Sequence, residues 1–197
     1  MMRKLGDLSS FRSGLQLSRS QNQKDDADFS YRVIRISNFG DLGTLDLRDL
    51  DQVAFAKPIL KDNLTQEGDV LVRLKAPLKA VYITKDYAGY VFSSVMAVIQ
   101  TDPNLLLPQY LAHYLNSSIP QGYFQECSTN GTTMSFLRLM DLRELEIHLP
   151  SLELQHKIAQ FVCESDKKLA LLQEKIKIET SLRNGRFKQF ITQGENQ

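Results

Sequence analysis

One cysteine and three histidines are the side chains that could supply a nucleophile and its base. Cys127 is the candidate nucleophile, and His113, His148 and His156 are the candidate bases. Such a pair needs the thiol and an imidazole within hydrogen-bond reach. The histidines are predicted on a helix, at a strand end and at a helix start, and no sequence signature surrounds the cysteine. We interpret all four as structural, and a small cysteine-dependent enzyme remains only a third alternative.

The acidic residues also lack a catalytic pattern. A metal nuclease pairs carboxylates with a lysine on a strand, whereas Asp41, Asp46, Asp49 and Asp51 fall in turn-like polar positions. No GxxxxGKS or GxxxxGKT loop is present. The segment most similar to a methyltransferase catalytic loop, at residues 116–123, has the wrong spacing. We therefore expect no catalytic residue, no metal and no cofactor.

The composition shows no strong excess of positive or negative charge. The 197 residues include 24 Lys and Arg against 23 Asp and Glu, a formal net charge of +1, so binding to a polyanion must come from local clusters. Cys127 and Cys163 are too few for a disulfide framework. The N-terminus has no apolar stretch behind its positive charges, and nowhere do eighteen apolar residues run together. We expect a cytoplasmic protein without a membrane span.

Cationic side chains gather in the first 35 residues and around the Ala76-Pro77 turn of a predicted hairpin. They suit DNA phosphates, and arginine also suits the acceptor edge of guanine. A polar loop at residues 128–133 adds hydroxyl and amide groups. A solvated hairpin and a plain turn are the alternative interpretations. The candidate DNA contacts are Arg12, Arg19, Arg73, Lys75, Lys79, Asn130 and Thr132.

The elements that would position these residues indicate an α+β fold. β-Branched and aromatic runs bounded by turn residues predict strands at 31–36, 69–74, 80–86 and 91–100, and another that ends at Leu149. Helices are predicted at 108–117, with Pro108 as the first residue, and at 121–126. We expect a globular β-rich domain with short helices at 1–150, followed by a long C-terminal helix at 151–197.

The C-terminal helix carries a narrow apolar stripe with a period near 3.5, typical of a coiled-coil seam. It starts at Pro150-Ser151, and Asn184-Gly185 should weaken or end it. Thirty-odd helical residues span roughly 50 Å, which is longer than one small domain can cover. A second helix is expected against the stripe, unless the helix folds back on its own domain. The candidate dimer or subunit contacts are Ile158, Phe161, Val162, Leu169, Leu172 and Ile176.

Three segments carry a resemblance to a known family. They are KLGDL at 4–8, GDVLV at 68–72 and GTTMSFLRLMDLRELEIHLPSLELQHKIAQFV at 131–162. In their order and spacing they resemble one half of a Type I restriction-modification specificity subunit. The third segment matches the family pattern of a polar loop, a strand ending in proline, and a helix that opens with Leu154, Gln155 and the Lys157-Ile158-Ala159 step.

The resemblance implies a function without catalysis. Residues 1–150 would be a target recognition domain that reads half of a split double-stranded DNA site, and 151–197 a conserved spacer helix. The partners would be methyltransferase and possibly restriction subunits, and a second copy through the helix. The family protein carries this unit twice, so a half-subunit that dimerises, a fragment and a silent cassette all stay open. A protein-interaction adaptor without DNA binding is the alternative function. Two-fold symmetry between two copies would give inverted-repeat half-sites.

Overall fold

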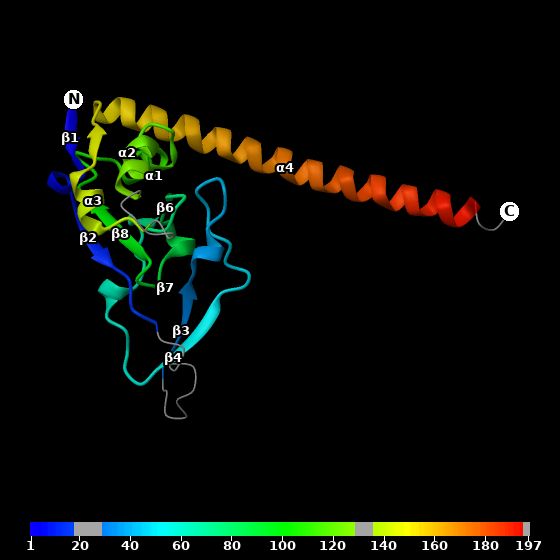
Figure 1. Ribbon diagram of the computed structural model, residues 1–197, viewed down its shortest axis with the longest axis horizontal. Helices are drawn as coiled ribbons and strands as arrows, with labels where there is room; N and C mark the ends of the chain where they lie inside the picture. The colour runs from blue at the N-terminus through cyan, green and yellow to red at the C-terminus, as the bar shows by residue number, and fades with distance from the viewer. Residues whose placement is uncertain (18–28, 129–135, 195–197) are drawn as a thin grey trace. The chain divides into compact units, whose positions relative to one another are not determined.

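A computed structural model describes residues 1–17, 29–128 and 136–194 of the chain (Figure 1). The chain divides into two compact units, Met1–Ala159 and Gln160–Gln197. The strands are β1 (Met2–Lys4), β2 (Ser9–Ser13), β3 (Phe29–Ile34), β4 (Asp51–Phe55), β5 (Val70–Arg73), β6 (Lys79–Tyr82), β7 (Val91–Phe92), β8 (Met96–Thr101) and β9 (Glu146–His148). The helices are α1 (Pro108–Asn116), α2 (Gln121–Ser128), α3 (Leu139–Glu144) and α4 (Leu152–Gly194), with short 3-10 helices η1 (Leu5–Asp7), η3 (Ile36–Asn38), η4 (Lys61–Asn63) and η5 (Lys85–Tyr87). The predicted α+β class is confirmed.

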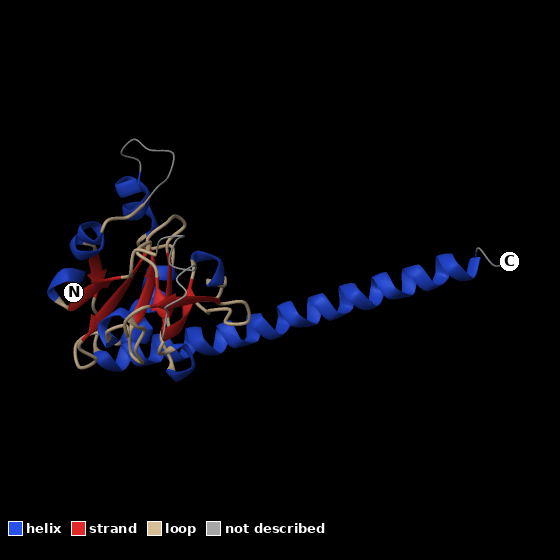
Figure 2. Cartoon of the chain, turned by 90° about the horizontal axis from the view of Figure 1, so that it is seen from below, coloured by secondary structure: helices blue, strands red, loops and turns tan. Residues whose placement is uncertain are grey.

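An antiparallel four-stranded sheet in the order β2-β8-β5-β6 lies at the centre of the globular unit. A second sheet has the order β4-β3-β7, with β3 antiparallel to β4 and parallel to β7. The short strands β1 and β9 pair with each other. In Figure 2 the strands, drawn in red, gather inside the globular unit with short helices around them.

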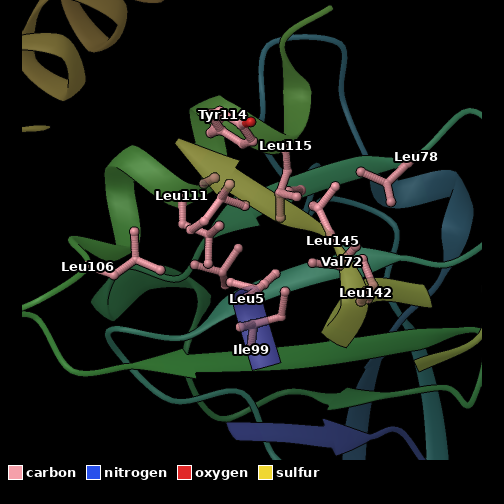
Figure 3. Packing of buried hydrophobic residues seen from close by; sticks show 14 of the residues in the cluster. Leu5, Val72, Leu78, Ile99, Leu106, Leu111, Tyr114, Leu115, Leu142 and Leu145 are labelled. Carbon is pink, nitrogen blue, oxygen red and sulfur yellow. The ribbon is translucent and has the colours of Figure 1, made fainter. Parts of the chain in front are cut away.

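The central sheet buries both of its faces. Successive strand residues point to opposite sides, so in β5 Val70 and Val72 enter one hydrophobic core and Leu71 enters another. Helix α1 covers the first face, where Leu111 and Leu115 are completely buried (Figure 3). The second face packs against residues of the β3 region and β7. This two-sided burial explains why the strands have continuous apolar runs rather than alternating ones.

Asn116, the last residue of α1, occupies part of the free edge of the central sheet. Its side-chain amide donates to the carbonyl of Ala80 in β6 at 2.7 Å and accepts from the Ala80 N–H at 2.8 Å. These are the two hydrogen bonds that a neighbouring strand would supply at that position. The contact also fixes the β5–β6 hairpin against the helix.

Two features of the secondary structure were not predicted from the sequence. The strand predicted at 91–100 is two strands, because the chain turns at Ser93-Ser94 and β7 joins a different sheet from β8. Helix α3 lies in a segment for which no helix was predicted. Asp141 starts this helix by accepting hydrogen bonds from the Arg138 N–H at 2.8 Å and its guanidinium at 2.7 Å. The hydrogen bond from the Arg138 side chain lowers the pKa of the Asp141 carboxyl group.

Helix α4 starts as predicted and is nearly as long as the predicted C-terminal helix. The Gln155 N–H donates to the Ser151 carbonyl at 2.9 Å, which places the first turn directly after Pro150-Ser151. The helix then continues through Asn184-Gly185 to Gly194, so this pair does not end the helix. One interior glycine costs only about 1 kcal/mol, which good helix formers on both sides offset. Its 43 residues span about 65 Å. None of the helices in the described part of the chain has the length and apolar character that a membrane crossing requires.

The first two turns of α4 belong to the globular unit, and Gln155 fixes them there. This side chain is completely buried. Its amide donates to the carbonyls of Leu105 at 3.1 Å and Pro150 at 3.0 Å and accepts from the Leu107 N–H at 2.8 Å. Ala159, one turn later, is also buried in the core. The helix therefore begins as part of the hydrophobic core.

Replacing Gln155 should destabilise the globular unit. Gln155→Ala removes the acceptor of a buried backbone N–H and two donors, so we expect the free energy of unfolding to fall by about 2 to 3 kcal/mol. Urea unfolding monitored by circular dichroism measures the change. The neighbouring His156 is exposed, and His156→Ala should stay within about 0.5 kcal/mol of the parent. Equal effects of the two substitutions would show that the buried amide contributes nothing.

Candidate nucleic-acid interface

The predicted hairpin around Ala76-Pro77 is present. Strands β5 and β6 pair antiparallel, with Arg73 opposite Lys79 at the end next to the turn. The Arg73 guanidinium donates to the carbonyl of Lys75 at 2.9 Å and to that of Ala76 at 3.1 Å. Arg73 therefore closes the hairpin turn, and part of its donor capacity is already used.

Lys79 is held by the turn at residues 40–44. Its ammonium group forms an ion pair with Asp41 and a hydrogen bond with the Gly40 carbonyl at 3.3 Å. The hydrogen bond from Lys79 lowers the pKa of the exposed Asp41 carboxyl group. Gly43 allows this turn, because its φ of +62° disfavours side chains. The charge of Lys79 is thus partly neutralised within the protein.

Lys75 combines a free charge with an aromatic neighbour. Lys75 is half-buried, and within the described ranges no side chain or carbonyl pairs with its ammonium group. Its backbone forms an isolated bridge with Phe136, and the Leu137 N–H donates to the Leu74 carbonyl at 2.8 Å. The Phe136 side chain is 43% exposed. We call Lys75, Ala76, Pro77 and Phe136 the hairpin surface. Sequence reasoning missed the phenylalanine, although an aromatic residue directly after a polar loop was a usable signal.

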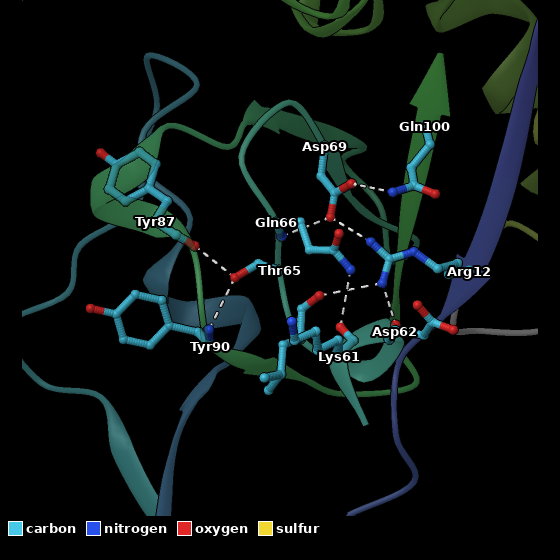
Figure 4. Close-up of polar contacts among 10 residues, drawn as sticks. Arg12, Lys61, Asp62, Thr65, Gln66, Asp69, Tyr87, Tyr90 and Gln100 are labelled. Carbon is cyan, nitrogen blue, oxygen red and sulfur yellow. Dashed lines mark hydrogen bonds and ion pairs between the residues drawn. The ribbon is translucent and has the colours of Figure 1, made fainter. Parts of the chain in front are cut away.

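Arg12 lies in the interior rather than on the hairpin surface. From β2 its guanidinium forms an ion pair with Asp69 at 2.6 Å and also donates to the carbonyls of Asp62 and Leu64 (Figure 4). Asp69 is only 1% exposed. Because the charge of Arg12 is used to pair a buried carboxylate, we do not include Arg12 in the proposed DNA surface.

The Asp69 carboxylate joins separate parts of the globular unit. One oxygen accepts from the Gln66 N–H at 2.9 Å, and the other from the Gln100 side chain of β8 at 3.0 Å. With the Arg12 ion pair, the carboxylate links β2, β8 and the turn before β5 (Figure 4). Figure 4 shows these side chains converging on Asp69. A buried carboxylate with several donors is stable only while all of them are present.

The remaining candidate DNA contacts cannot be placed. Arg19, Asn130 and Thr132 lie outside the described residues. Phe136 is the first described residue after two of them. The structure therefore brings Arg73, Lys75 and Lys79 together in one hairpin and separates Arg12 from them.

The candidate helix contacts differ in exposure. Ile158 packs partly against the core of the globular unit. Val162 is half-buried. Phe161 is 70% exposed, and the side chains of Leu169, Leu172 and Ile176 also face solvent.

The cysteine and the histidines lie on four different elements: Cys127 is in α2, and His113, His148 and His156 are in α1, β9 and α4. Cys127 is half-buried, and His148 and His156 are exposed. Nowhere in the described ranges do three His, Cys, Asp or Glu side chains gather as metal ligands.

Comparison with known proteins identifies the family. The sequence model described as "Type I restriction modification DNA specificity domain" matches residues 1–180. The chain belongs to this family. It is 24% identical over 139 residues to the Type I restriction enzyme EcoBI specificity subunit of Escherichia coli, an alignment that covers 70% of this chain and 29% of that protein. A specificity subunit is the non-catalytic component of its complex.

Solved structures share the fold. The HsdS subunit from Thermoanaerobacter tengcongensis superposes with a TM-score of 0.65 at 17% identity, covering 92% of this chain and 46% of that one. A second solved chain comes from a structure of complex assembly and conformational transition in the type I R-M system. It superposes with a TM-score of 0.68 at 17% identity and again covers 92% of this chain and 46% of that one. This chain spans less than half the length of each of these proteins.

Removing the Asp69 carboxylate should destabilise the fold. Asp69→Ala leaves a mostly buried guanidinium without its counter-charge, so we expect a loss of about 3 to 5 kcal/mol in the free energy of unfolding. Urea unfolding measures it. Asp62→Ala is the matched control, because Arg12 contacts only the backbone carbonyl of that exposed residue; its effect should stay below about 0.5 kcal/mol. A loss under 1 kcal/mol for Asp69→Ala would contradict the central role of the ion pair.

Proposed function

We propose that this chain is a DNA sequence-recognition subunit that reads one half of a bipartite site and directs methyltransferase subunits to it. The observation that carries the proposal is the family match over residues 1–180, which spans the globular unit and much of α4. Within this scheme residues 1–150 read DNA, and 151–197 set the separation between two reading units. This chain spans less than half the length of its relatives. The DNA half-site and the methyltransferase partners are therefore part of the proposal.

The hairpin surface is the proposed DNA contact of the described residues. Lys75 offers a charge that no group among the described residues neutralises, which suits a phosphate. Phe136 beside it can pack against a sugar or a thymine methyl group. Arg19, Asn130 and Thr132 stay predicted contacts. With Arg73 and Lys79 partly neutralised, few phosphates are contacted, so the isolated chain should bind DNA weakly.

The contribution of the Lys75 charge to DNA affinity should be measurable. Lys75→Ala should lower affinity for duplex DNA by removing about one phosphate contact, and so reduce the slope of log K against log salt by about 1. Fluorescence anisotropy with labelled duplex, using the chain together with its methyltransferase subunits, measures the slope. Genome-wide methylation in the host should also decrease.

The control for this substitution lies at the other end of the same hairpin. Lys85 in η5 carries the same charge and is exposed, but it follows the end of β6 that is far from the turn. Lys85→Ala should leave methylation and the salt slope unchanged. If the two alanine variants behave alike, the hairpin surface does not contact DNA.

Helix α4 is the proposed link between two recognition units. Leu169, Leu172 and Ile176 lie on one face of the helix and remain exposed in the single chain. Burying such a stripe needs a second helix. We propose that the helix comes from a second copy, which makes a homodimer with two reading units.

A second apolar stripe supports an additional partner. At about 100° per residue, Leu171, Ile178 and Leu182 lie on the side of α4 away from the first stripe, and they are 67%, 52% and 54% exposed. A helix with two opposed apolar stripes is suited to contact more than one neighbour. The methyltransferase subunits are the proposed occupant of this second stripe.

The two stripes can be separated by mutation. The double variant Leu169→Glu with Leu172→Glu should dissociate the dimer, because four carboxylates would be buried in one seam. Light scattering should then give the 22.5 kDa monomer mass instead of twice that value. Leu171→Glu, on the opposite side, should leave the dimer mass unchanged. The reverse pattern would assign self-association to the second stripe.

An adaptor without DNA binding is the second candidate. It is favoured by the internal engagement of three predicted DNA contacts, since Arg12, Arg73 and Lys79 all bind protein oxygens. In that case only α4 carries function. Unchanged methylation in Lys75→Ala, together with loss of methylation in the α4 double variant, would favour the adaptor.

A further inference from the structure

A cavity of about 390 Å³ lies beside the β1–β9 sheet of the globular unit. We call it the β1–β9 pocket. Two tyrosine side chains line it, Ile119 and Met2 are exposed by 69% and 51%, and two glutamates add carboxylates. The lining includes Met2, Tyr114, Ile119, Tyr123, Glu144 and Glu146.

The pocket has an excess of negative charge. Lys4 is the cation at its edge; it forms an ion pair with Glu144 at 2.5 Å and lies opposite Glu146 in the β1–β9 register. Two carboxylates therefore face one ammonium group. The Tyr123 hydroxyl donates to the Asp141 carbonyl at 2.9 Å, and burial raises its pKa to about 12, so it adds no charge near neutral pH.

These groups suit a cationic side chain. Guanidinium and ammonium groups bind carboxylates and aromatic faces together. The same carboxylates repel phosphate, so DNA is a poor occupant. A basic side chain accompanied by an apolar one would satisfy both the glutamates and the exposed Ile119.

The far end of α4 has this complementary chemistry. Beyond Ile176 the face that carries the apolar stripe continues with Arg183, Phe187 and Phe190, and Arg186 lies at its flank. The two phenylalanines are 65% and 72% exposed. The stripe thus changes from aliphatic to basic and aromatic over its last two turns.

The spacing along the stripe sets how two copies can pair. A parallel pair would place Arg183 against its own counterpart, and likewise Glu179, which like-charge repulsion disfavours. In an antiparallel pair, the aliphatic part of the stripe on one helix lies against the same part of the other helix. Each heptad position a then faces a position d of the partner. The opposed positions are then Ile158 with Ile176, Val162 with Leu172, and Ser165 with Leu169.

That alignment carries the end of α4 past the start of α4 in the other copy. Leu182 falls opposite Leu152, the first residue of the helix, so Arg186 lies about one turn beyond that start. Shortly before Leu152 in the chain, His148 ends β9 opposite Met2 of β1, and Met2 lines the pocket. The Leu149 N–H also donates to the Met1 carbonyl at 2.8 Å, so the pocket edge and the start of α4 are adjacent.

We propose that the β1–β9 pocket binds the end of α4 from a second copy of this chain, with Arg186 as the cation and Phe187 and Phe190 against the exposed apolar rim. This proposal rests on the α4 pairing proposed above. Each pocket would be filled reciprocally, so the dimer contains two such contacts. The contact would fix the antiparallel direction, which the aliphatic seam alone does not.

Cross-linking of full-length chains tests the contact. In a background with Cys127→Ser and Cys163→Ser, one preparation carries Met2→Cys and the other carries Phe187→Cys. After mixing, a short bismaleimide should join them into a covalent dimer. Ile178→Cys in place of Phe187→Cys should not cross-link to Met2→Cys, because it lies on the opposite stripe.

A charge exchange provides an independent measurement. Glu146→Arg should weaken the dimer about three-fold to ten-fold in Kd, and Arg186→Glu in the same chain should restore it. Sedimentation velocity measures both. A dimer with no Met2 to Phe187 cross-link and no effect of Glu146→Arg overturns the pocket contact and leaves the α4 pairing intact. A parent chain that stays monomeric overturns the pairing itself and the pocket contact with it.

Discussion

Burial of both faces of the central sheet is the constraint on which the other contacts depend. A sheet covered on two sides leaves little room for water at its polar groups, so most of them bind protein partners, although Arg12 Nε and Thr101 Oγ1 are buried without one. Asp69 does so with Arg12 and Gln100, and Gln155 does so with three backbone groups. The polar residues that look available for DNA in the sequence are partly those that satisfy the core.

This constraint separates structural from available cations. Arg12, Arg73 and Lys79 each bind oxygens within the globular unit, whereas Lys75 has no such partner among the described residues. Charge counting cannot make this distinction, because it depends on which carbonyls and carboxylates the fold brings near each cation. The hairpin that holds three of them was nevertheless predictable, since its turn lies between two β-branched runs.

Local patterns predicted the α+β class, helix α1 and the start of α4, because these depend on propensity, a first-turn proline and a change of period. The break at Ser93-Ser94 was missed because both new strands are apolar and join different sheets, a tertiary choice. Helix α3 was missed because it is short and its start depends on the hydrogen bond from the Arg138 N–H to the Asp141 side chain, which has no periodic signal in the sequence. The β1–β9 pocket joins residues over a hundred positions apart, so sequence spacing gave no signal of it.

The Asn116 side chain has a consequence for how this protein can associate. Its amide occupies both hydrogen-bonding groups of Ala80 on the outer strand of the central sheet. An incoming peptide would have to displace that amide before it could extend the sheet at β6. Strand addition, the common route by which exposed edges recruit other chains or aggregate, is therefore blocked at this position. Association is left to helices and loops, whose side chains distinguish one partner from another better than a row of backbone groups does.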